Sequence, residues 1–378
     1  MIETKKVTQI NSDGATFNAE FINLGKDEIV EYGFFFGGKQ IPIIIFDSTL
    51  LHDKANKGVF SKTMDARLAG NTIYHVKGYA KTNNNIVYGN EIEFESQGSK
   101  YSPWDLFHNT DFRFGRRVYF TNDNEKGFII TTESGAFRSY DPISNTFKTL
   151  KKVPIDGHSG TRCATFALGG FVYFISNDLQ NVLRYDMAND IWEAHSSRPL
   201  VPDDQTHGLV ANGTGYFLST SGMYYYDSNS QIWVKKTDSP SSTIHSAQVI
   251  GNKVYVMAGP TRTIFMYDLE SNVWVTKTQY PGQWKAEIIA FTLNNKIYWG
   301  LSYSTGVNAM AVNDMWEYNT TLNSWKEVES LPLTHSGSEL IAFSINSVGY
   351  FGYGYNDPSR TTDLFEIIVY RFDPQKIK

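Results

Sequence analysis

The chain has 378 residues, and its 25 Phe, 23 Tyr and 8 Trp make up 15% of them. Charged residues make up only 19%, and the net charge of -5 excludes the basic footprint of a nucleic-acid-binding protein. The apolar and aromatic content excludes a disordered chain, while the apolar stretches are too short to span a bilayer. A single cysteine excludes an internal disulfide framework and a cysteine-based zinc cluster. High Tyr, Phe and Gly contents favour an all-β fold.

The first residues, Met1 to Lys6, include the charged residues Glu3, Lys5 and Lys6, and no apolar segment of the kind found in a signal peptide follows them. The protein is therefore either cytoplasmic or the product of a removed leader. A single cysteine fits both compartments, so composition leaves the location open.

Residues 1–97 show the alternation of apolar and polar side chains that is typical of half-buried strands. In residues 15–22, Phe17, Ala19 and Phe21 fall on one face, and Thr16, Asn18 and Glu20 on the other. Turn-forming clusters rich in Asn, Asp and Gly separate this run from its neighbours. About seven short strands in this length favour a β-sandwich. The strands are predicted at 6–10, 15–22, 29–36, 41–46, 58–65, 72–82 and 86–95.

The end of this region, Tyr74-His-Val-Lys-Gly-Tyr-Ala80 followed by residues 85–94, resembles the last two strands of fibronectin type III-like domains. The resemblance covers roughly residues 5–96 and places Tyr74 at the tyrosine corner of an immunoglobulin-like or fibronectin type III-like sandwich. Such domains are common in surface and secreted proteins of Bacteroidetes-type bacteria, so the resemblance implies a cell-surface or periplasmic location. A lipid anchor on a removed leader is compatible with this location. Residues 97–103 are predicted to form a linker, which divides the chain into domains 1–97 and 98–378.

The rest of the chain repeats one pattern, in which a Tyr-Asp pair is followed by Trp or Phe. A fifth copy has Asn in place of Asp. Each copy also has an earlier aromatic residue on a predicted strand. The repeated aromatic pairs are Tyr140 with Phe147, Tyr185 with Trp192, Tyr226 with Trp233, Tyr267 with Trp274 and Tyr318 with Trp325. The earlier aromatics are Phe128, Tyr173, Tyr216, Tyr255, Tyr298 and Tyr350.

Phe372-Asp373 begins a sixth copy, but the chain ends before its second aromatic. Trp104 is the expected replacement, because it precedes Phe128 by 24 residues, just as Trp192 precedes Tyr216. We therefore predict that residues 100–106 form the outer strand of the last repeat, alongside three strands from residues 339–373. This arrangement would close a ring of six sheets without leaving an exposed sheet edge.

Over residues 99–373 this pattern resembles the kelch-type β-propellers, including the galactose-oxidase-like group. The Tyr-Asp and Trp half of the kelch signature is kept, whereas the Gly-Gly doublet that usually follows the second strand is absent. A WD40 propeller is a weaker match, because no Trp-Asp ends the third strand. In such a fold the repeated Trp and Tyr are expected to fill the space between neighbouring sheets, with the Tyr-Asp pair capping a turn.

A propeller commonly binds its ligand where the central channel opens, and the start of each innermost strand is expected there. Ionisable residues recur at this position, and more polar or aromatic residues lie close by in the sequence. One interpretation is that these residues form a solvated ring with internal ion pairs. The other is that they form a binding site for a polar ligand, in which Arg side chains would bind carboxylate or hydroxyl groups. The recurring residues are Arg117, Arg162, His207, His245, Glu287 and Glu339, with Trp284 and His335 nearby.

The fifth and sixth repeats are longer between their second and third strands than the other four. Long loops in a compact repeat protein are often functional. These loops are expected to carry Tyr303, Tyr353 and Tyr355 to the same rim, where aromatic rings suit the C–H faces of a sugar. The alternative is that the loops are additions without a function.

Motifs of known catalytic sites are mostly lacking, including His-Glu-x-x-His, Gly-x-Ser-x-Gly and the phosphate-binding loop. The copper site of galactose oxidase needs a Cys–Tyr crosslink, whereas Cys163 is expected to be a buried apolar residue. We predict no metal and no cofactor. The favoured function is non-catalytic glycan recognition, with a protein ligand as another possible partner. The alternatives are a sialic-acid-epimerase-like or mutarotase enzyme that uses acid–base residues at the channel mouth, and a protein-interaction scaffold.

Overall fold

A computed structural model describes residues 1–38, 47–51, 55–114, 118–132, 134–155, 163–176, 179–199, 206–283, 287–303, 311–331, 339–355 and 365–377. The description is limited to the backbone for residues 47, 48, 50, 107–114, 287, 302, 303, 311–313, 339, 353–355 and 365–368. The described part of the chain is all-β apart from one short 3-10 helix, η1 (Pro374–Lys376).

The N-terminal strands form two groups that enclose one apolar core. A three-stranded antiparallel sheet has the order β1-β2-β5. The second group packs its apolar face on that sheet, and Phe17 is in ring contact with Phe34, Phe36 and Phe94 across the core. The first sheet consists of β1 (Ile2–Asn11), β2 (Gly14–Phe21) and β5 (Gly58–Met64). The second group consists of β3 (Ile29–Gly38), β4 (Asp47–Leu51), β6 (Gly70–Thr82), β7 (Ile86–Tyr88) and β8 (Ile92–Gln97).

The predicted strand at 86–95 is wrong in one respect, because it is two strands, β7 and β8, with a break between them. At the break, the Gly89 N–H donates to the carbonyl oxygen of Gly78 at 2.8 Å. A side chain at Gly89 would lie 2.5 Å from the Thr4 hydroxyl, so β1 approaches the chain too closely for continuous pairing. The strand predicted at 41–46 lies outside the described residues.

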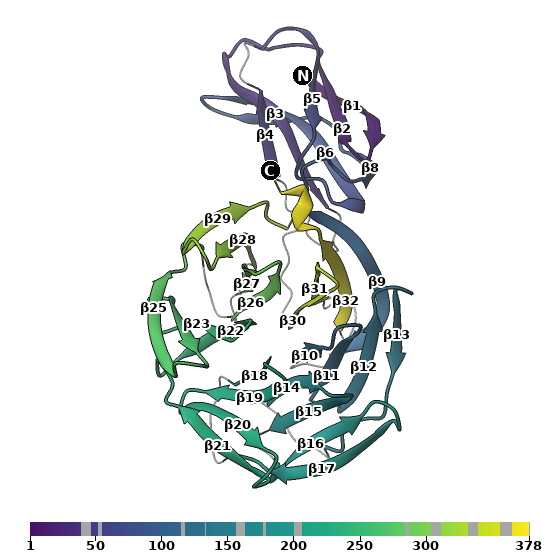
Figure 1. The fold of residues 1–378 in the computed structure, drawn as a ribbon. Helices are drawn as coiled ribbons and strands as arrows, with labels where there is room; N and C mark the ends of the chain where they lie inside the picture. The colour runs from purple at the N-terminus through teal and green to yellow at the C-terminus, as the bar shows by residue number, and fades with distance from the viewer. Residues whose placement is uncertain are drawn as a thin grey trace.

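From residue 104 onwards, strands are grouped in fours. Five separate antiparallel sheets, here numbered I to V, each contain four strands that are consecutive along the chain. The order β30-β31-β32-β9 repeats this pattern within a larger nine-stranded sheet, and we call this part sheet VI. Figure 1 shows sheets I to VI around a common centre, with their first strands innermost. Their first strands are β10 (Val118–Asn122), β14 (Cys163–Leu168), β18 (His207–Ala211), β22 (Ile244–Ile250), β26 (Glu287–Leu293) and β30 (Glu339–Ile345).

The remaining strands follow outwards from the centre. Second strands are β11 (Gly127–Thr131), β15 (Phe171–Ser176), β19 (Thr214–Ser219), β23 (Lys253–Ala258), β27 (Lys296–Tyr303) and β31 (Val348–Tyr355). Third strands are β12 (Ala136–Asp141), β16 (Asn181–Asp186), β20 (Gly222–Asp227), β24 (Thr263–Asp268), β28 (Ala311–Asn319) and β32 (Phe365–Phe372). Fourth strands are β13 (Thr146–Thr149), β17 (Ile191–Ser197), β21 (Ile232–Thr237), β25 (Val273–Gln279), β29 (Ser324–Val328) and, in sheet VI, β9 (Trp104–Phe114).

We call the end at which the first strands begin the upper face, and the end at which they turn into the second strands the lower face. Each first strand contacts the first strand of the next sheet, and β30 contacts β10. An apolar cluster fills each of the six spaces between neighbouring sheets, including the space between sheets VI and I. The core is therefore divided into wedges between sheets.

The predicted role of the Tyr-Asp pair is confirmed. In sheet II, the Asp186 carboxylate accepts the backbone N–H groups of Ala188 and Asn189, and so closes the turn into β17. The Tyr185 hydroxyl donates to Asp190 at 2.6 Å. Trp192, directly opposite Tyr185, also contacts Phe137 of sheet I, with ring centroids 5.2 Å apart. The repeated aromatics are thus wedges between sheets, as the spacing predicts.

The predicted partner of the C-terminal strand is confirmed as well, although the partner strand spans Trp104–Phe114 and not residues 100–106. Trp104 lies opposite Phe372, which is the pairing that the third and fourth strands make in every other sheet. Trp104 is completely buried. The aromatic missing from the C-terminal repeat is therefore supplied from the beginning of the repeat region.

Residues 97–103, predicted to be a linker, are instead packed between the N-terminal sheets and sheet VI. Ser99 and Ser102 are each 1% exposed. The Ser99 hydroxyl donates to the Leu68 carbonyl oxygen at 3.0 Å, and the Tyr101 N–H donates to the Asp65 carbonyl oxygen at 3.0 Å. The segment connects β8 to β9, as predicted. Its burial was not predicted, because Gly, Ser and Pro suit both exposed linkers and tight turns whose backbone is bonded to a neighbouring element.

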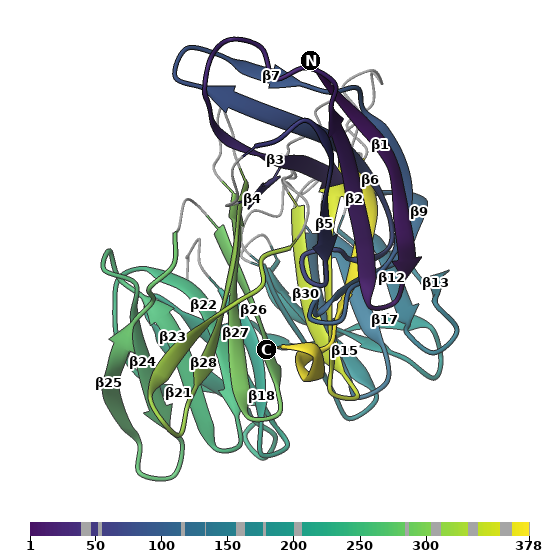
Figure 2. The same cartoon turned by 90° about the horizontal axis from the view of Figure 1, so that it is seen from above.

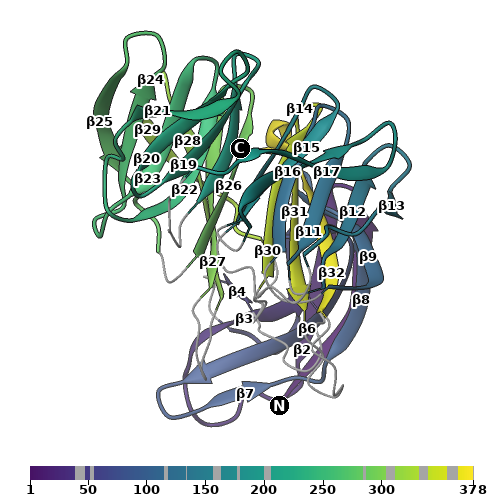
Figure 3. The ribbon, with the colours of Figure 1, turned by 90° about the horizontal axis from the view of Figure 1, so that it is seen from below.

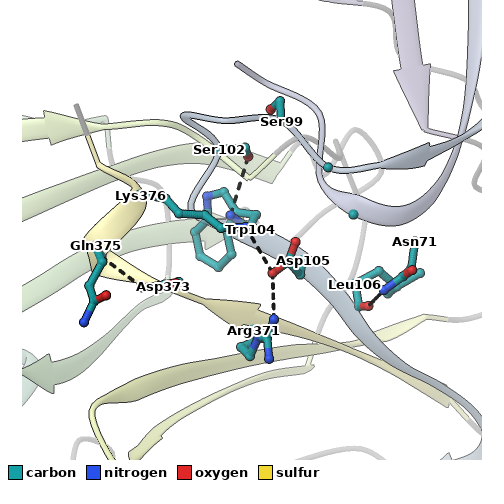
Figure 4. Close-up of polar contacts among 12 residues, drawn as sticks. Asn71, Ser99, Ser102, Trp104, Asp105, Leu106, Arg371, Asp373, Gln375 and Lys376 are labelled. Carbon is teal, nitrogen blue, oxygen red and sulfur yellow. Dashed lines mark hydrogen bonds and ion pairs between the residues drawn. The ribbon is translucent and has the colours of Figure 1, made fainter. Parts of the chain in front are cut away.

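The strands themselves cross this junction. β6 pairs in parallel with β9 through Gly70 and Asp105, and the Asn71 side chain donates to the Leu106 carbonyl oxygen. The Asp105 carboxylate also accepts from Arg371 and Lys376, which ties β9 to the C-terminal end of the chain (Figure 4). Figures 2 and 3 show the N-terminal strands standing on one side of the grouped sheets.

Candidate functional site

The first strands of sheets I to VI enclose a cavity of about 610 Å³ at the centre of the molecule. Five of the six strands contribute three consecutive residues each to the wall, for example Phe120 to Asn122 in β10, and β14 contributes four, Thr165 to Leu168. The wall also includes the turns at Asp123 and Gly169 on the lower face. The cavity therefore occupies the middle and lower part of a central channel. Its volume is within the range of small-molecule sites.

Uncharged hydroxyl and amide groups provide most of the polar part of this wall. The Gln248 amide donates to the Ala290 carbonyl oxygen at 3.0 Å and accepts from the Thr292 hydroxyl at 2.9 Å. The Asn122 amide donates to the Ser344 carbonyl oxygen at 2.9 Å. These bonds satisfy carbonyl groups on the free edges of first strands, which would otherwise face the channel without a partner.

Among the described residues that line the cavity, Asp123 alone has an ionisable side chain. Its carboxylate already accepts the backbone N–H groups of Glu125 and Lys126, at 2.7 and 2.6 Å. The cavity itself is therefore suited to neutral hydroxylated groups, and any strong charge on a ligand would have to be met elsewhere.

The ionisable residues predicted at the channel mouth lie at the upper ends of the first strands. His207, Glu287 and Glu339 are the first residues of β18, β26 and β30, and His245 is the second residue of β22. The two glutamates therefore begin first strands that contact one another. In each of these strands, the first residue that lines the cavity comes one to three residues after the ionisable residue. Arg117 and Arg162 lie outside the described residues.

His245 makes a contact with its own sheet. Its Nε2 atom lies 3.0 Å from the carbonyl oxygen of Gly259, so this nitrogen carries the proton and donates. Gly259 begins the turn between β23 and β24, which is also on the upper face. His245 thus links the start of a first strand to a neighbouring turn.

The predicted aromatic residues of the rim lie on strands. Tyr303 is the last residue of β27 and is directly opposite Glu287, and Tyr353 and Tyr355 lie in β31 on either side of Gly354, which pairs with Glu339. Part of the extra length in sheets V and VI is therefore longer strands. The expectation that these tyrosines lie in loops was wrong because their alternation with small residues also suits paired strands. Trp284 and His335 lie outside the described residues.

The comparisons with solved structures concern this architecture. The chain is similar to the structure of YjhT, with 12% sequence identity, a TM-score of 0.55, and coverage of 70% of this chain and 95% of that one. A similarity to a fungal alcohol oxidase of the AA5 family in complex with copper has 10% identity and a TM-score of 0.49, and covers 79% of this chain and 68% of that one. No protein-family model matches the sequence, and no curated protein does.

The fold is a β-propeller, similar in architecture to the structure of YjhT. At this level of identity the similarity concerns the fold alone, so the chemistry of the propeller has to be argued from its own residues. Within the described ranges, no group of three or more His, Cys, Asp or Glu side chains is placed to hold a metal ion. No helix in the same ranges is long and apolar enough to cross a membrane.

One polar cluster of the propeller was not predicted. Arg262, Tyr280 and Asp314 meet on the upper face between sheets IV and V, beside the segment that leads to Trp284 and Glu287. Burial raises the pKa of the Asp314 carboxyl, and the neighbouring Arg262 opposes this effect. The three residues are far apart in the sequence, and the carboxylate does not recur at the equivalent positions of the other sheets, so the repeat pattern could not have brought them together.

Proposed function

We propose that residues 98–378 form a six-bladed propeller, in which sheets I to VI are the blades, and that residues 1–97 form a fibronectin type III-like domain. The cyclic order of contacts among first strands, with β30 against β10, supports the first part. The buried Tyr74 supports the second part, because its hydroxyl accepts the Ala69 N–H at 2.9 Å, as a tyrosine corner requires.

The function that the site supports best is recognition of a glycan, without catalysis, at the upper mouth of the channel. The observation that carries this proposal is the combination of a cavity whose polar lining is mainly hydroxyl and amide groups with glutamates at the starts of the first strands above it. Hydroxyl groups of a sugar would bond to the wall, and the rim residues would bond to its polar substituents. We place this activity outside the cytoplasm, at the cell surface or in the periplasm, on the strength of the fibronectin type III-like resemblance.

A glycan array probed with the full-length protein tests this proposal. Saturation-transfer NMR with N-acetylneuraminic acid, galactose and N-acetylglucosamine then separates acidic from neutral sugars. We expect Glu287→Gln and Glu339→Gln each to weaken binding of the best array oligosaccharide by about tenfold, or 1.4 kcal/mol. Asp227→Ala, in a turn on the lower face, is the matched control and should bind like the wild type. If the folded protein binds no glycan on the array, the proposal of glycan recognition is wrong.

A second candidate function is a sugar epimerase or mutarotase. It is favoured by Glu287 and Glu339 at the starts of two adjacent first strands, because acid–base catalysis on a sugar uses two positioned proton-transfer groups. NMR exchange spectroscopy of the same sugars detects interconversion of their anomers. Exchange faster than in buffer, and lost in both Glu→Gln variants, would replace the binding function with the catalytic one.

A further inference from the structure

The segment Tyr280–Gln283 connects β25 to β26 and is held by hydrogen bonds from two other parts of the upper face. The Tyr280 N–H donates to the Arg262 carbonyl oxygen at 3.0 Å, and the Arg262 guanidinium donates back to the Gly282 carbonyl oxygen at 2.6 Å. The Gln283 N–H donates to the Asp314 carboxylate at 2.7 Å. The segment is therefore bonded along its length to sheets IV and V.

Asp314 is the centre of this arrangement. The carboxylate oxygen that accepts from Gln283 also accepts from the Trp316 indole at 3.0 Å. Its other oxygen and the Tyr280 hydroxyl are buried, and among the described residues neither makes a hydrogen bond of normal geometry. A buried polar oxygen without a full set of bonds costs free energy, so Asp314 is not placed here to maximise stability.

Gly282 leaves no room for a side chain within this cluster. A Cβ atom there would lie 2.3 Å from the Asp314 carboxylate, 2.5 Å from the Tyr280 hydroxyl and 2.6 Å from the Trp316 indole nitrogen. The backbone of the segment therefore packs directly on these three groups, because residue 282 has no side chain.

The propeller fold itself does not require an acidic residue at this position. Asp314 lies three residues before Glu317, the third-strand residue that pairs with the repeated aromatic Tyr298. The strand registers give the residue at this same position in every other sheet. The equivalent residues in sheets I to IV and VI are Ala136, Asn181, Gly222, Thr263 and Ile368. The carboxylate is specific to sheet V, the sheet whose first strand begins with Glu287.

We infer that Asp314 and Arg262 are positioning residues of the upper mouth, which hold residues 280–283 so that the start of β26, with Glu287 as its first residue, is presented to a bound sugar. Gln283 lies four residues before Glu287, the first residue of β26, so we expect a displacement of its backbone to move the start of this strand. The inference rests on the proposed glycan-binding function. It adds a set of residues that do not touch the sugar themselves and affect its binding only by holding the backbone of residues 280–283 in place.

Substitutions at two different points of the cluster test this inference. Asp314→Ala removes the acceptor, whereas Gly282→Ala keeps every hydrogen-bonding group and displaces the segment by steric overlap. We expect both to weaken binding of the best array oligosaccharide by about tenfold or more, and to increase hydrogen exchange in residues 280–290. Asp314→Asn keeps an oxygen acceptor for Gln283 and Trp316 and should restore both measurements.

Asp227→Ala is again the control, because it removes a turn-capping carboxylate from the lower face. Unchanged binding and unchanged exchange in both Asp314→Ala and Gly282→Ala would overturn the inference, and so would increased exchange with unchanged binding. If the wild type binds no sugar, the proposed function fails by itself, and positioning of a bound sugar fails with it. Hydrogen exchange of the same variants would then still establish or refute the clamp on residues 280–283.

Discussion

At the residue scale, the space between sheets is filled by matching large and small side chains. Phe166, Phe291 and Phe343 occupy the same place in their first strands, opposite the repeated aromatic of the second strand. Each packs against a glycine of the next sheet, where a Cβ atom would lie within 2.4 to 2.7 Å of the ring. Those glycines are Gly215, Gly349 and Gly127. The pair Phe343–Gly127 joins sheet VI to sheet I and so supports ring closure.

This match predicts a measurable coupling between Phe343 and Gly127. Gly127→Val should destabilise the protein by about 1–3 kcal/mol through overpacking, and Phe343→Ala by about 3–5 kcal/mol through the cavity it leaves. The double variant should be at least about 1 kcal/mol more stable than the sum predicts, as measured by urea unfolding. Gly127→Val combined with Phe166→Ala, two residues that are not in contact, should be additive. Additivity in both double variants would argue against the Phe343 contact.

His195 is a second feature at this scale, and it predicts a dependence of stability on pH. Its ring lies between Tyr173 of sheet II and Tyr226 of sheet III, with centroids 5.3 and 4.5 Å away. Burial lowers the pKa of His195, and the nearby Arg184 lowers it further. The unfolded chain therefore binds a proton at this histidine at a higher pH than the folded protein does.

It follows that stability should fall as the pH drops below about 6.5, the ordinary pKa of histidine. His195→Phe keeps an aromatic ring in the wedge and cannot bind a proton. We expect the difference in free energy of unfolding between pH 8 and pH 5.5 to be smaller in this variant than in the wild type. Equal differences would show that His195 does not contribute to the acid sensitivity.

At the scale of elements, sheet VI is unusual because it joins the two ends of the repeat region without a covalent connection between its third and fourth strands. The pairing of Phe372 with Trp104 repeats the pairing of the other sheets, and the Trp104 indole also donates to the Glu329 carbonyl oxygen at 2.8 Å. This seam is therefore a point where the ring could open locally.

We expect Trp104→Ala to destabilise the protein by about 3–5 kcal/mol and to increase hydrogen exchange in both β9 and β32. The control is Trp274→Ala, at the same place in sheet IV, whose strands are continuous in the chain. It should increase exchange in β24 and β25 and leave β32 protected. Protection of β32 in the Trp104 variant would mean that the seam does not depend on this side chain.

At the scale of the whole molecule, the N-terminal sheets are bonded to the propeller through strands and buried turns. Gly70 allows this contact, because a Cβ atom there would lie 2.7 Å from the Asp105 carboxylate. Since Asp105 also binds Arg371 of β32 and Lys376 of η1, the junction includes the C-terminal end of the chain. This arrangement predicts one fixed orientation of the two parts.

Double electron–electron resonance measures this orientation. Spin labels at Val59 and Ile143, which are 68% and 87% exposed, report on the N-terminal sheets and on sheet I. Cys163→Ala removes the native cysteine, which is 2% exposed, from the labelling background. We expect one narrow distance for this protein and a broad distribution after Gly70→Val. A broad distribution before the Gly70 substitution would contradict a rigid junction.

The sequence by itself determined the repeat, the wedge role of its aromatics, the Asp-capped turns and the pairing of Trp104 with the C-terminal strand. These features are local or recur at a fixed spacing, so one copy explains the others. His207, His245, Glu287 and Glu339 were predicted to within one position of the starts of their first strands for the same reason.

Only the tertiary structure decided the features that depend on contacts between unlike segments. The turn at Ser99–Pro103 has the composition of a linker, and its burial depends on Leu68 and Asp65 of another sheet. The cluster of Arg262, Tyr280 and Asp314 likewise joins segments that no spacing relates. Composition and periodicity describe how a strand presents its faces to its neighbours. Which particular neighbour meets it is settled by the packing of the completed molecule.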